Sequence, residues 1–143
     1  GRQLTVVPVL GMNLGIAVCY DIRFPELARL MTLKGAEMLA LPGAFNHVSG
    51  PAHWEILLRN RAVENTVWVA GVSGMAPTDA SYQAWGHSML VGPFGDVAAN
   101  MGRAEGVAFS VMDPTLLKEV RARLPLLKQR RDDVYSLTLN SSL

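Results

Sequence analysis

Two short apolar runs separated by one amphipathic segment constrain the fold of this chain more than any other feature. The runs cover residues 14–19 and 38–41, and each is continuously apolar, which is typical of a strand buried on both faces. Between them, Pro25 indicates the first position of a helix and Gly35 indicates its end. This order of strand, helix and strand predicts neighbouring buried strands of one sheet, and therefore an α/β fold.

The rest of the chain continues the layered pattern. Further helices are predicted over residues 52–65 and from Pro114, capped by Asp113, to a break after Leu124. Further strands are predicted over residues 66–72, 88–91, 97–99 and 107–111, the second and third of them joined as a hairpin. Loops are predicted over residues 42–51 and 71–85, and an extended tail over residues 126–143. No internal repeat or linker interrupts the sequence, so we expect one domain.

Charge and hydropathy exclude several classes of partner. The 143 residues carry 13 Lys and Arg against 12 Asp and Glu, so the chain lacks the one-signed field that attracts nucleic acid or an anionic membrane. No apolar run reaches the roughly 18 residues that span a bilayer, and no signal peptide is recognised. The single cysteine excludes an internal disulfide. We expect a soluble cytoplasmic protein that acts on a small molecule, and a mitochondrial location stays open because processing removes transit peptides.

Cys19 is the residue best placed for covalent chemistry. It stands at the carboxyl end of an apolar strand and shortly before a helix, where open α/β sheets hold reactive groups and a helix dipole favours a thiolate. The same position suits an ordinary core cysteine, and the spacing does not decide between the two. A cysteine nucleophile normally needs a base, but His47, His53 and His87 show no partner signature and fit capping, packing or surface roles.

The sequence predicts no metal and no cofactor. One cysteine and three scattered histidines give no metal-ligand spacing. No Gly-rich segment after a strand matches a phosphate-binding motif. The basic run at residues 128–131 is offset by Asp132 and Asp133, which favours a solvated or interface tail over a nucleic-acid patch.

The residues around Cys19 resemble a known motif. Residues 15–27 read Gly-Ile-Ala-Val-Cys-Tyr-Asp-Ile-Arg-Phe-Pro-Glu-Leu and are similar to the nucleophile motif of the nitrilase, or carbon-nitrogen hydrolase, superfamily. Four further segments match in order and spacing, so the resemblance covers about residues 14–135; they are residues 42–46, 50–55, 61–65 and 85–88. The resemblance implies a four-layer α-β-β-α sandwich, with residues 1–143 as the carboxyl-terminal part of a single carbon-nitrogen hydrolase domain that supplies about half of it.

Two segments look most like omega-amidases within that superfamily, namely residues 43–46 and 81–88. Omega-amidases hydrolyse the terminal amide of alpha-ketoglutaramate and alpha-ketosuccinamate, whereas close relatives that act on deaminated glutathione tend to differ at both segments. The resemblance therefore implies hydrolysis of a small carboxamide of this kind to an acid and ammonia. A deaminated-glutathione amidase and a truncated, non-catalytic interaction module are the alternatives.

The resemblance also implies the chemistry. Cys19 would attack the amide carbon to form a thioester, and the backbone N–H of Tyr20 would donate to the tetrahedral oxyanion. In the family, the glutamate that acts as general base and the lysine that assists the oxyanion precede the nucleophile strand, and the residues before Cys19 do not contain them. We therefore expect the isolated chain to be inactive without an amino-terminal half, and the complete protein to be a homodimer or larger.

A substrate pocket is implied beside the nucleophile. Arg23 would hold the carboxylate of the substrate as a bidentate guanidinium, with an ion pair to Asp21 or Glu26 as the alternative. Phe45 and Ser49 would line the same pocket, with core packing and a turn hydroxyl as their alternatives.

Overall fold

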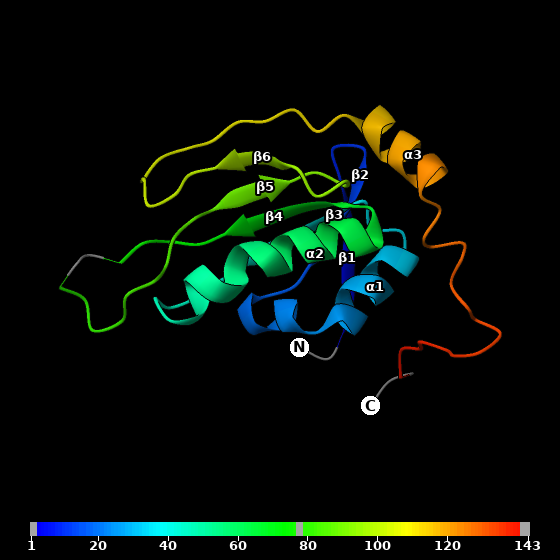
Figure 1. Cartoon of the computed structure of the whole chain (residues 1–143), viewed down its shortest axis with the longest axis horizontal. Helices are drawn as coiled ribbons and strands as arrows, with labels where there is room; N and C mark the ends of the chain where they lie inside the picture. Colours follow the sequence, from blue (N-terminus) through cyan, green and yellow to red (C-terminus); the bar gives the residue numbers. More distant parts are fainter. Residues whose placement is uncertain (1–2, 77–78, 141–143) are drawn as a thin grey trace.

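The computed structural model describes residues 3–76 and 79–140, and within them one mixed sheet organises the chain. Its six strands follow the order β1-β2-β3-β4-β5-β6, so neighbours in sequence are also neighbours in the sheet (Figure 1). The strands are β1 (Thr5–Val9), β2 (Met12–Ile16), β3 (Met38–Pro42), β4 (Trp68–Val72), β5 (Met89–Val91) and β6 (Val97–Asn100). The central strands β2, β3 and β4 run parallel, whereas β1, β5 and β6 pair antiparallel with their neighbours. The α/β class expected from the sequence is confirmed.

Two helices connect the parallel strands and lie in front of the sheet in Figure 1. Helix α1 (Pro25–Leu33) joins β2 to β3, and α2 (Glu55–Asn65) joins β3 to β4. A short 3₁₀ helix, Cys19–Arg23, precedes α1, and one π-helical turn, Gly50–Trp54, leads into α2. Helix α1 ends at the Lys34 cap, and Gly35 follows with a φ of +96°. These elements confirm the predicted order of strand, helix and strand. Among the described residues, no helix has the length and hydropathy that a membrane span requires.

The core fills the space between the sheet and the two helices. Its apolar side chains come from the strands, from the inward faces of α1 and α2, and from the 3₁₀ helix and the π-helical turn. The largest of them that are fully buried are Trp54, Ile22, Met31, Leu39, Leu58, Val67, Val69 and Val91. The 3₁₀ helix that follows β2 contacts β3, α1 and α2, and the two helices also contact each other.

Gly71 of β4 offers a test of this packing, because two core side chains lie directly against it. A Cβ atom there would lie 2.4 Å from Cδ1 of Leu58 and 2.8 Å from Cζ2 of Trp54, two fully buried side chains. We expect Gly71→Ala to lower the free energy of unfolding by about 1–3 kcal/mol, as overpacked cores do. Chemical denaturation measures the loss, and Gly74→Ala is the matched control, because no described atom lies within 4 Å of its Cβ position. Equal stability of the two variants would contradict the packing.

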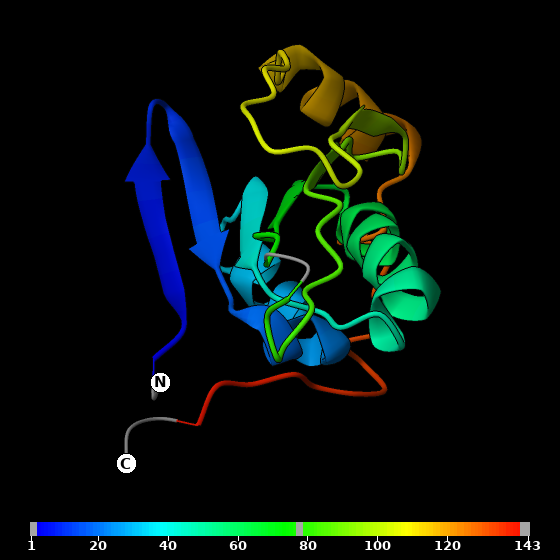
Figure 2. The ribbon, with the colours of Figure 1, turned by 90° about the vertical axis from the view of Figure 1, so that its left-hand side faces the viewer.

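The first strand was not predicted, and the second is shorter and more exposed than predicted. The β1–β2 hairpin turns through Leu10 and Gly11, both with positive φ (47° and 83°), and stands at the edge of the sheet away from α2 (Figure 2). Strand β2 ends at Ile16, and Ile16 and Val18 are exposed on the face opposite the buried Gly15. The prediction of burial on both faces is therefore wrong for β2, because no described helix or strand packs on that face.

The strand predicted over residues 107–111 is also wrong. This segment forms no ladder, and its alternating apolar residues Val107, Phe109 and Val111 are 77%, 93% and 85% exposed. It instead runs beside the sheet face opposite α2, where it lines an apolar groove together with Met38 and Val72. Alternating apolar residues indicate which side of an extended segment packs against apolar surface. They form a strand only where the edge of a sheet offers hydrogen-bonding partners. The four-layer sandwich would cover this face with a second sheet, and that layering stays a prediction.

The carboxyl-terminal elements agree more closely with the sequence. The β5–β6 hairpin is confirmed, and so is helix α3 (Pro114–Arg123), whose cap Asp113 accepts a hydrogen bond from the Thr115 N–H at 2.7 Å. That hydrogen bond lowers the pKa of the Asp113 carboxyl. After α3 the chain contains turns but no helix or strand through residue 140, and it passes α1 on its way back toward the start of β1 (Figures 1 and 2). Residues 141–143 of the predicted tail lie outside the described residues.

Candidate active site

A sharp turn at the end of β2 carries Cys19. The Ala17 N–H still donates to the Ala40 carbonyl at 3.1 Å, and two residues later the chain bends into the 3₁₀ helix. At the bend Cys19 has a φ of +67°, a left-handed conformation that strains a residue with a Cβ by about 1–3 kcal/mol. Backbone strain of this kind needs support from surrounding contacts, and it clusters at functional sites. Four non-glycine residues among those described have a positive φ, and Cys19 is the one that also lies at the end of a parallel strand, so its backbone supports the candidate independently of the sequence motif.

Contacts on both sides hold this turn in place. Asp21 clamps it reciprocally: its N–H donates to the Val18 carbonyl at 2.9 Å, and its carboxylate accepts from the Val18 N–H at 2.9 Å. A Cβ atom on Gly43, just after β3, would lie 3.4 Å from the Cα of Cys19, so the carboxyl ends of β2 and β3 meet here. Cys19 is half-buried and packs against the core.

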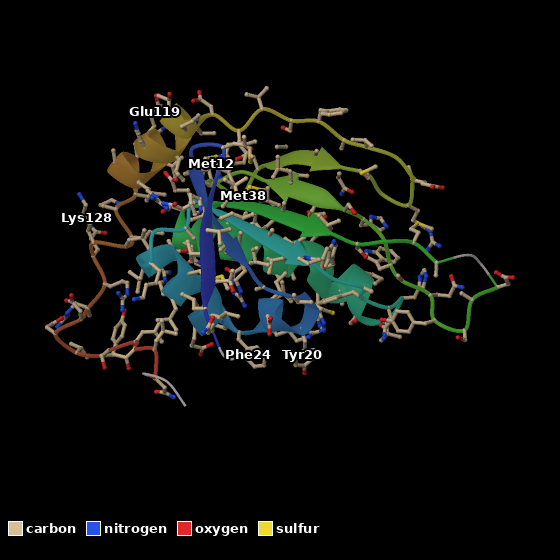
Figure 3. The ribbon with its side chains drawn as sticks, turned by 180° about the vertical axis from the view of Figure 1, so that it is seen from behind. Met12, Tyr20, Phe24, Met38, Glu119 and Lys128 are labelled. Carbon is tan, nitrogen blue, oxygen red and sulfur yellow. The ribbon has the colours of Figure 1, made fainter. Side chains whose placement is uncertain are left out.

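Tyr20 lies next in the chain, with its ring outside and its N–H at the start of the 3₁₀ helix. Figure 3 shows the side chains of Tyr20 and Phe24 together at the outer surface, where their rings meet edge to face with centroids 5.8 Å apart. The first N–H groups of a helix have no partner within it, and among the described residues the Tyr20 N–H donates to no backbone or side-chain acceptor. The geometry thus leaves a free donor directly after Cys19, which suits the predicted oxyanion role.

Arg23 is the last residue of the 3₁₀ helix, and its guanidinium lies close to two aromatic rings. The guanidinium carbon lies 4.8 Å from the ring centroid of Phe45 and 5.2 Å from that of Tyr20, both within cation–π range. One terminal nitrogen lies 3.2 Å from Nδ1 of His53, and the buried Nε has no partner among the described residues. The alternative of an ion pair with Asp21 or Glu26 is not realised within those residues, so the cation lacks a carboxylate partner.

The structure brings Phe45 to this site but not Ser49. Phe45 is buried, lies beside the Arg23 guanidinium and packs against Trp54 with ring centroids 5.1 Å apart, so the packing alternative is realised and its pocket role stays a prediction. The hydroxyl of Ser49 instead donates to Oδ1 of Asn46 at 3.0 Å, and so do the N–H groups of Val48 and Ser49. Ser49 therefore acts as the turn hydroxyl, and no contact joins it to Cys19 or Arg23 in the described chain.

Two histidines lie in positions that the sequence did not reveal. His53 contacts Arg23 across 30 residues of sequence, and no local spacing could have found that contact. His87 has a φ of +58°, stacks on Trp85 with ring centroids 4.2 Å apart, and accepts a hydrogen bond at its carbonyl from Nε1 of Trp54 at 2.8 Å. Burial, followed by the nearby charge of Arg103, lowers the pKa of His87, so its imidazole stays neutral under conditions that would protonate a free histidine.

No metal centre accompanies these groups in the described ranges, where no three His, Cys, Asp or Glu side chains gather closely enough to hold an ion. The site consists of a thiol on a strained backbone, together with a backbone N–H that has no acceptor and a guanidinium that has no carboxylate partner among residues 3–76 and 79–140. All three lie beside the carboxyl ends of β2 and β3. Such a set can bind a small anionic molecule and attack an electrophilic carbon within it.

Known proteins resemble the chain over most of its length. The profile of a family described as Carbon-nitrogen hydrolase matches residues 1–122. The chain is 45% identical over 137 residues to the omega-amidase NIT2 of Danio rerio, and 45% identical over 127 residues to the omega-amidase NIT2 of Homo sapiens. These alignments cover 96% and 89% of the chain but 50% and 46% of the relatives, so the chain spans about half the length of the curated relatives it matches.

A solved structure gives the same relationship in three dimensions. A Saccharomyces cerevisiae member of branch 10 of the nitrilase superfamily superposes with a TM-score of 0.87 at 42% sequence identity. The superposition covers 92% of this chain and 48% of that one.

Proposed function

The chain belongs to the carbon-nitrogen hydrolase family, and from this premise we propose that the full-length protein is an amidase of the omega-amidase type. Its substrate would be a small carboxamide with a carboxylate at the far end, such as alpha-ketoglutaramate, and its products the acid and ammonia. Two relatives at 45% identity carry the name omega-amidase, which supports this choice of reaction.

The cation of Arg23 is the observation that carries the proposal. A guanidinium stacked on Phe45 and left without a carboxylate partner can receive a substrate carboxylate through charge-assisted hydrogen bonds. Arg23 follows Cys19 by only four positions, and one 3₁₀ helix contains both. A short substrate with a carboxylate at one end and an amide at the other therefore matches the pair.

The proposed reaction is acyl transfer in two steps. The thiolate of Cys19 attacks the amide carbon while the Tyr20 N–H donates to the developing oxyanion. The carbon–nitrogen bond then breaks, the nitrogen takes up a proton and leaves as ammonia, and a thioester remains on Cys19. Water attacks the thioester carbon, the carbon–sulfur bond breaks, and the acid leaves with Cys19 restored.

The acid–base groups of this reaction are not assigned to acidic or basic side chains that follow Cys19. Glu26 is exposed in the first turn of α1, and Lys34 is exposed at its carboxyl end. Glu55 lies on the outer surface of α2, half-exposed and 3.4 Å from Arg59. We propose that the general-base glutamate and the oxyanion lysine lie outside these 143 residues, and that the chain by itself does not turn over.

Ammonia release by the full-length protein, the natural polypeptide that contains these residues, tests the proposal. We expect kcat/KM for alpha-ketoglutaramate to exceed that for deaminated glutathione by about 10-fold or more, which is the discrimination that a few pocket contacts provide. Butyramide, which has no carboxylate, should be a poorer substrate than either. A higher kcat/KM for deaminated glutathione than for alpha-ketoglutaramate would replace the proposal with a deaminated-glutathione amidase. Absence of ammonia release from all three compounds would favour a non-catalytic module.

A further inference from the structure

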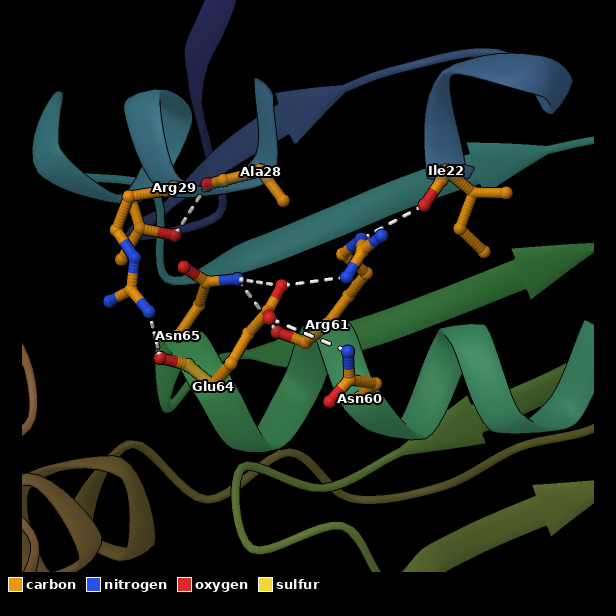
Figure 4. Close-up of polar contacts among 8 residues, drawn as sticks. Ile22, Ala28, Arg29, Asn60, Arg61, Glu64 and Asn65 are labelled. Atoms are coloured by element: carbon orange, nitrogen blue, oxygen red, sulfur yellow. Dashed lines mark hydrogen bonds and ion pairs between the residues drawn. The ribbon is translucent and has the colours of Figure 1, made fainter. Parts of the chain in front are cut away.

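A buried arginine on α2 reaches the helical turn that carries the nucleophile. Arg61 is only 3% exposed, and its Nε donates to the carbonyl of Ile22 at 2.9 Å (Figure 4). Ile22 lies in the 3₁₀ helix Cys19–Arg23, three residues after the strained position, and its side chain is buried as well. A carbonyl near the carboxyl end of a short helix has no partner within that helix, so Arg61 satisfies an otherwise unpaired acceptor.

A polar network fixes the guanidinium of Arg61 in turn. Its Nη1 donates to Oε1 of Glu64 at 2.8 Å, one turn along the same helix, and this carboxylate balances the buried charge. Asn65 donates to the same carboxylate at 3.3 Å and to the Arg61 carbonyl at 3.0 Å. Arg29 on α1 donates to the Glu64 carbonyl, which joins the two helices (Figure 4). The Arg61 guanidinium is therefore held by Glu64 of its own helix, and Arg29 ties that helix to α1.

The strained turn needs support at both of its ends. Asp21 clamps the end that precedes Cys19 through its two hydrogen bonds with Val18. At the other end, Arg61 is the side chain that binds a backbone atom of the 3₁₀ helix. Loss of Arg61 would let the helix rotate or unwind, and Cys19 could then relax from its φ of +67°. The free N–H of Tyr20 would move with it, because the two residues share one peptide plane.

We propose that Arg61 is a positioning residue for the reaction: through the Ile22 carbonyl it holds the thiol of Cys19 and the N–H of Tyr20 in their reactive arrangement. This inference rests on the proposed function. Arginine suits the task better than lysine, because its planar fork spans two acceptors at once, the Ile22 carbonyl and the Glu64 carboxylate.

The proposal is tested with two variants of the full-length protein, Arg61→Met and Arg61→Lys, and with Arg59→Met as the control. Arg59 is the matched control, since it lies on the same helix and donates its Nε to a backbone carbonyl at 2.9 Å, but to that of Gly95 in the β5–β6 turn. Three quantities are measured in each variant: Tm, the kcat and KM of ammonia release, and the rate at which iodoacetamide alkylates Cys19. Mass spectrometry of the peptide that carries Cys19 gives the alkylation rate well below Tm.

We expect Arg61→Met to lower kcat by about 100-fold with KM nearly unchanged, as small misplacements of reacting groups do. The rate at which Cys19 is alkylated should change severalfold in the same variant. Arg61→Lys should restore part of kcat and part of the alkylation rate, and Arg59→Met should leave both quantities at their wild-type values. A lower Tm with wild-type kcat and alkylation rate would overturn the proposal and leave Arg61 a purely structural residue. If Arg61→Met does not fold, Arg61→Lys decides the question, because it keeps a charge beside Glu64.

The alkylation rate also separates this inference from the proposed function. If the wild-type protein released no ammonia from any amide, a change in alkylation confined to the Arg61 variants would still support the positioning role. If wild-type activity were present and neither kcat nor alkylation responded to Arg61, the positioning role would fail and the amidase would stand.

Discussion

Replacing Cys19 with serine is expected to lower kcat for ammonia release by about 1,000-fold or more, with Tm close to that of the wild type. The hydroxyl matches the thiol in shape, so the half-buried site stays filled, but an unactivated hydroxyl is a far weaker nucleophile than a thiolate. Ammonia release from alpha-ketoglutaramate at saturating substrate gives kcat, and mass spectrometry of the quenched reaction shows whether an acyl group is bound to the peptide that carries Cys19. Wild-type turnover by Cys19→Ser would remove Cys19 from the mechanism.

Two further variants separate the strain at Cys19 from its chemistry. Cys19→Ala and Cys19→Gly both remove the thiol and should be equally inactive, but only glycine adopts a φ of +67° without strain. We expect the glycine variant to be more stable than the alanine variant by about 1 kcal/mol, measured by chemical denaturation. If alanine proved the more stable, the turn would be relaxed at position 19, and the case for a supported, strained nucleophile would weaken.

The parallel part of the fold could be predicted because its signals are local. The apolar runs of β2 and β3, the proline that opens α1 and the Gly35 that follows it all lie within about 30 residues of one another. Asp113 before Pro114 gave the cap of α3 in the same way. Where the local pattern did not match the surroundings, prediction failed: residues 107–111 alternate like a strand, yet they form no ladder.

The candidate site, too, could be predicted only where its signals are local in sequence. The sequence motif located Cys19, Tyr20 and Arg23, since all three lie on one short helix. It did not reveal that Cys19 has a left-handed backbone, because this conformation is imposed by tertiary contacts and normally favours glycine. Contacts between distant segments were also invisible, such as His53 beside Arg23 and Arg61 on the Ile22 carbonyl. The spacing of residues within α2 does not indicate that this helix contacts the turn after β2.

Replacing Arg23 with methionine is expected to change which amides the protein hydrolyses. The variant loses the charge-assisted hydrogen bonds to the substrate carboxylate, worth about 1.5–3 kcal/mol, so kcat/KM for alpha-ketoglutaramate should fall by about 10- to 100-fold. Butyramide has no carboxylate, and its kcat/KM should stay within about 3-fold of the wild-type value. Arg23→Lys should lie between, because an ammonium keeps the charge but loses the bidentate fork and the stacking on Phe45.

The Tm of Arg23→Met and a control variant decide how its loss of kcat/KM is interpreted. Methionine packs well against the Phe45 ring, the buried Nε of Arg23 has no partner in the described chain, and the hydrogen bond to His53 that is lost is exposed, so Tm should fall little. Arg59→Met removes an arginine from the surface of α2 and should leave both substrates unaffected. A parallel loss for alpha-ketoglutaramate and butyramide in Arg23→Met would mean that Arg23 shapes the site for any amide. Only a loss confined to the substrate with a carboxylate assigns its guanidinium to the anion, because butyramide presents the same amide group without that charge.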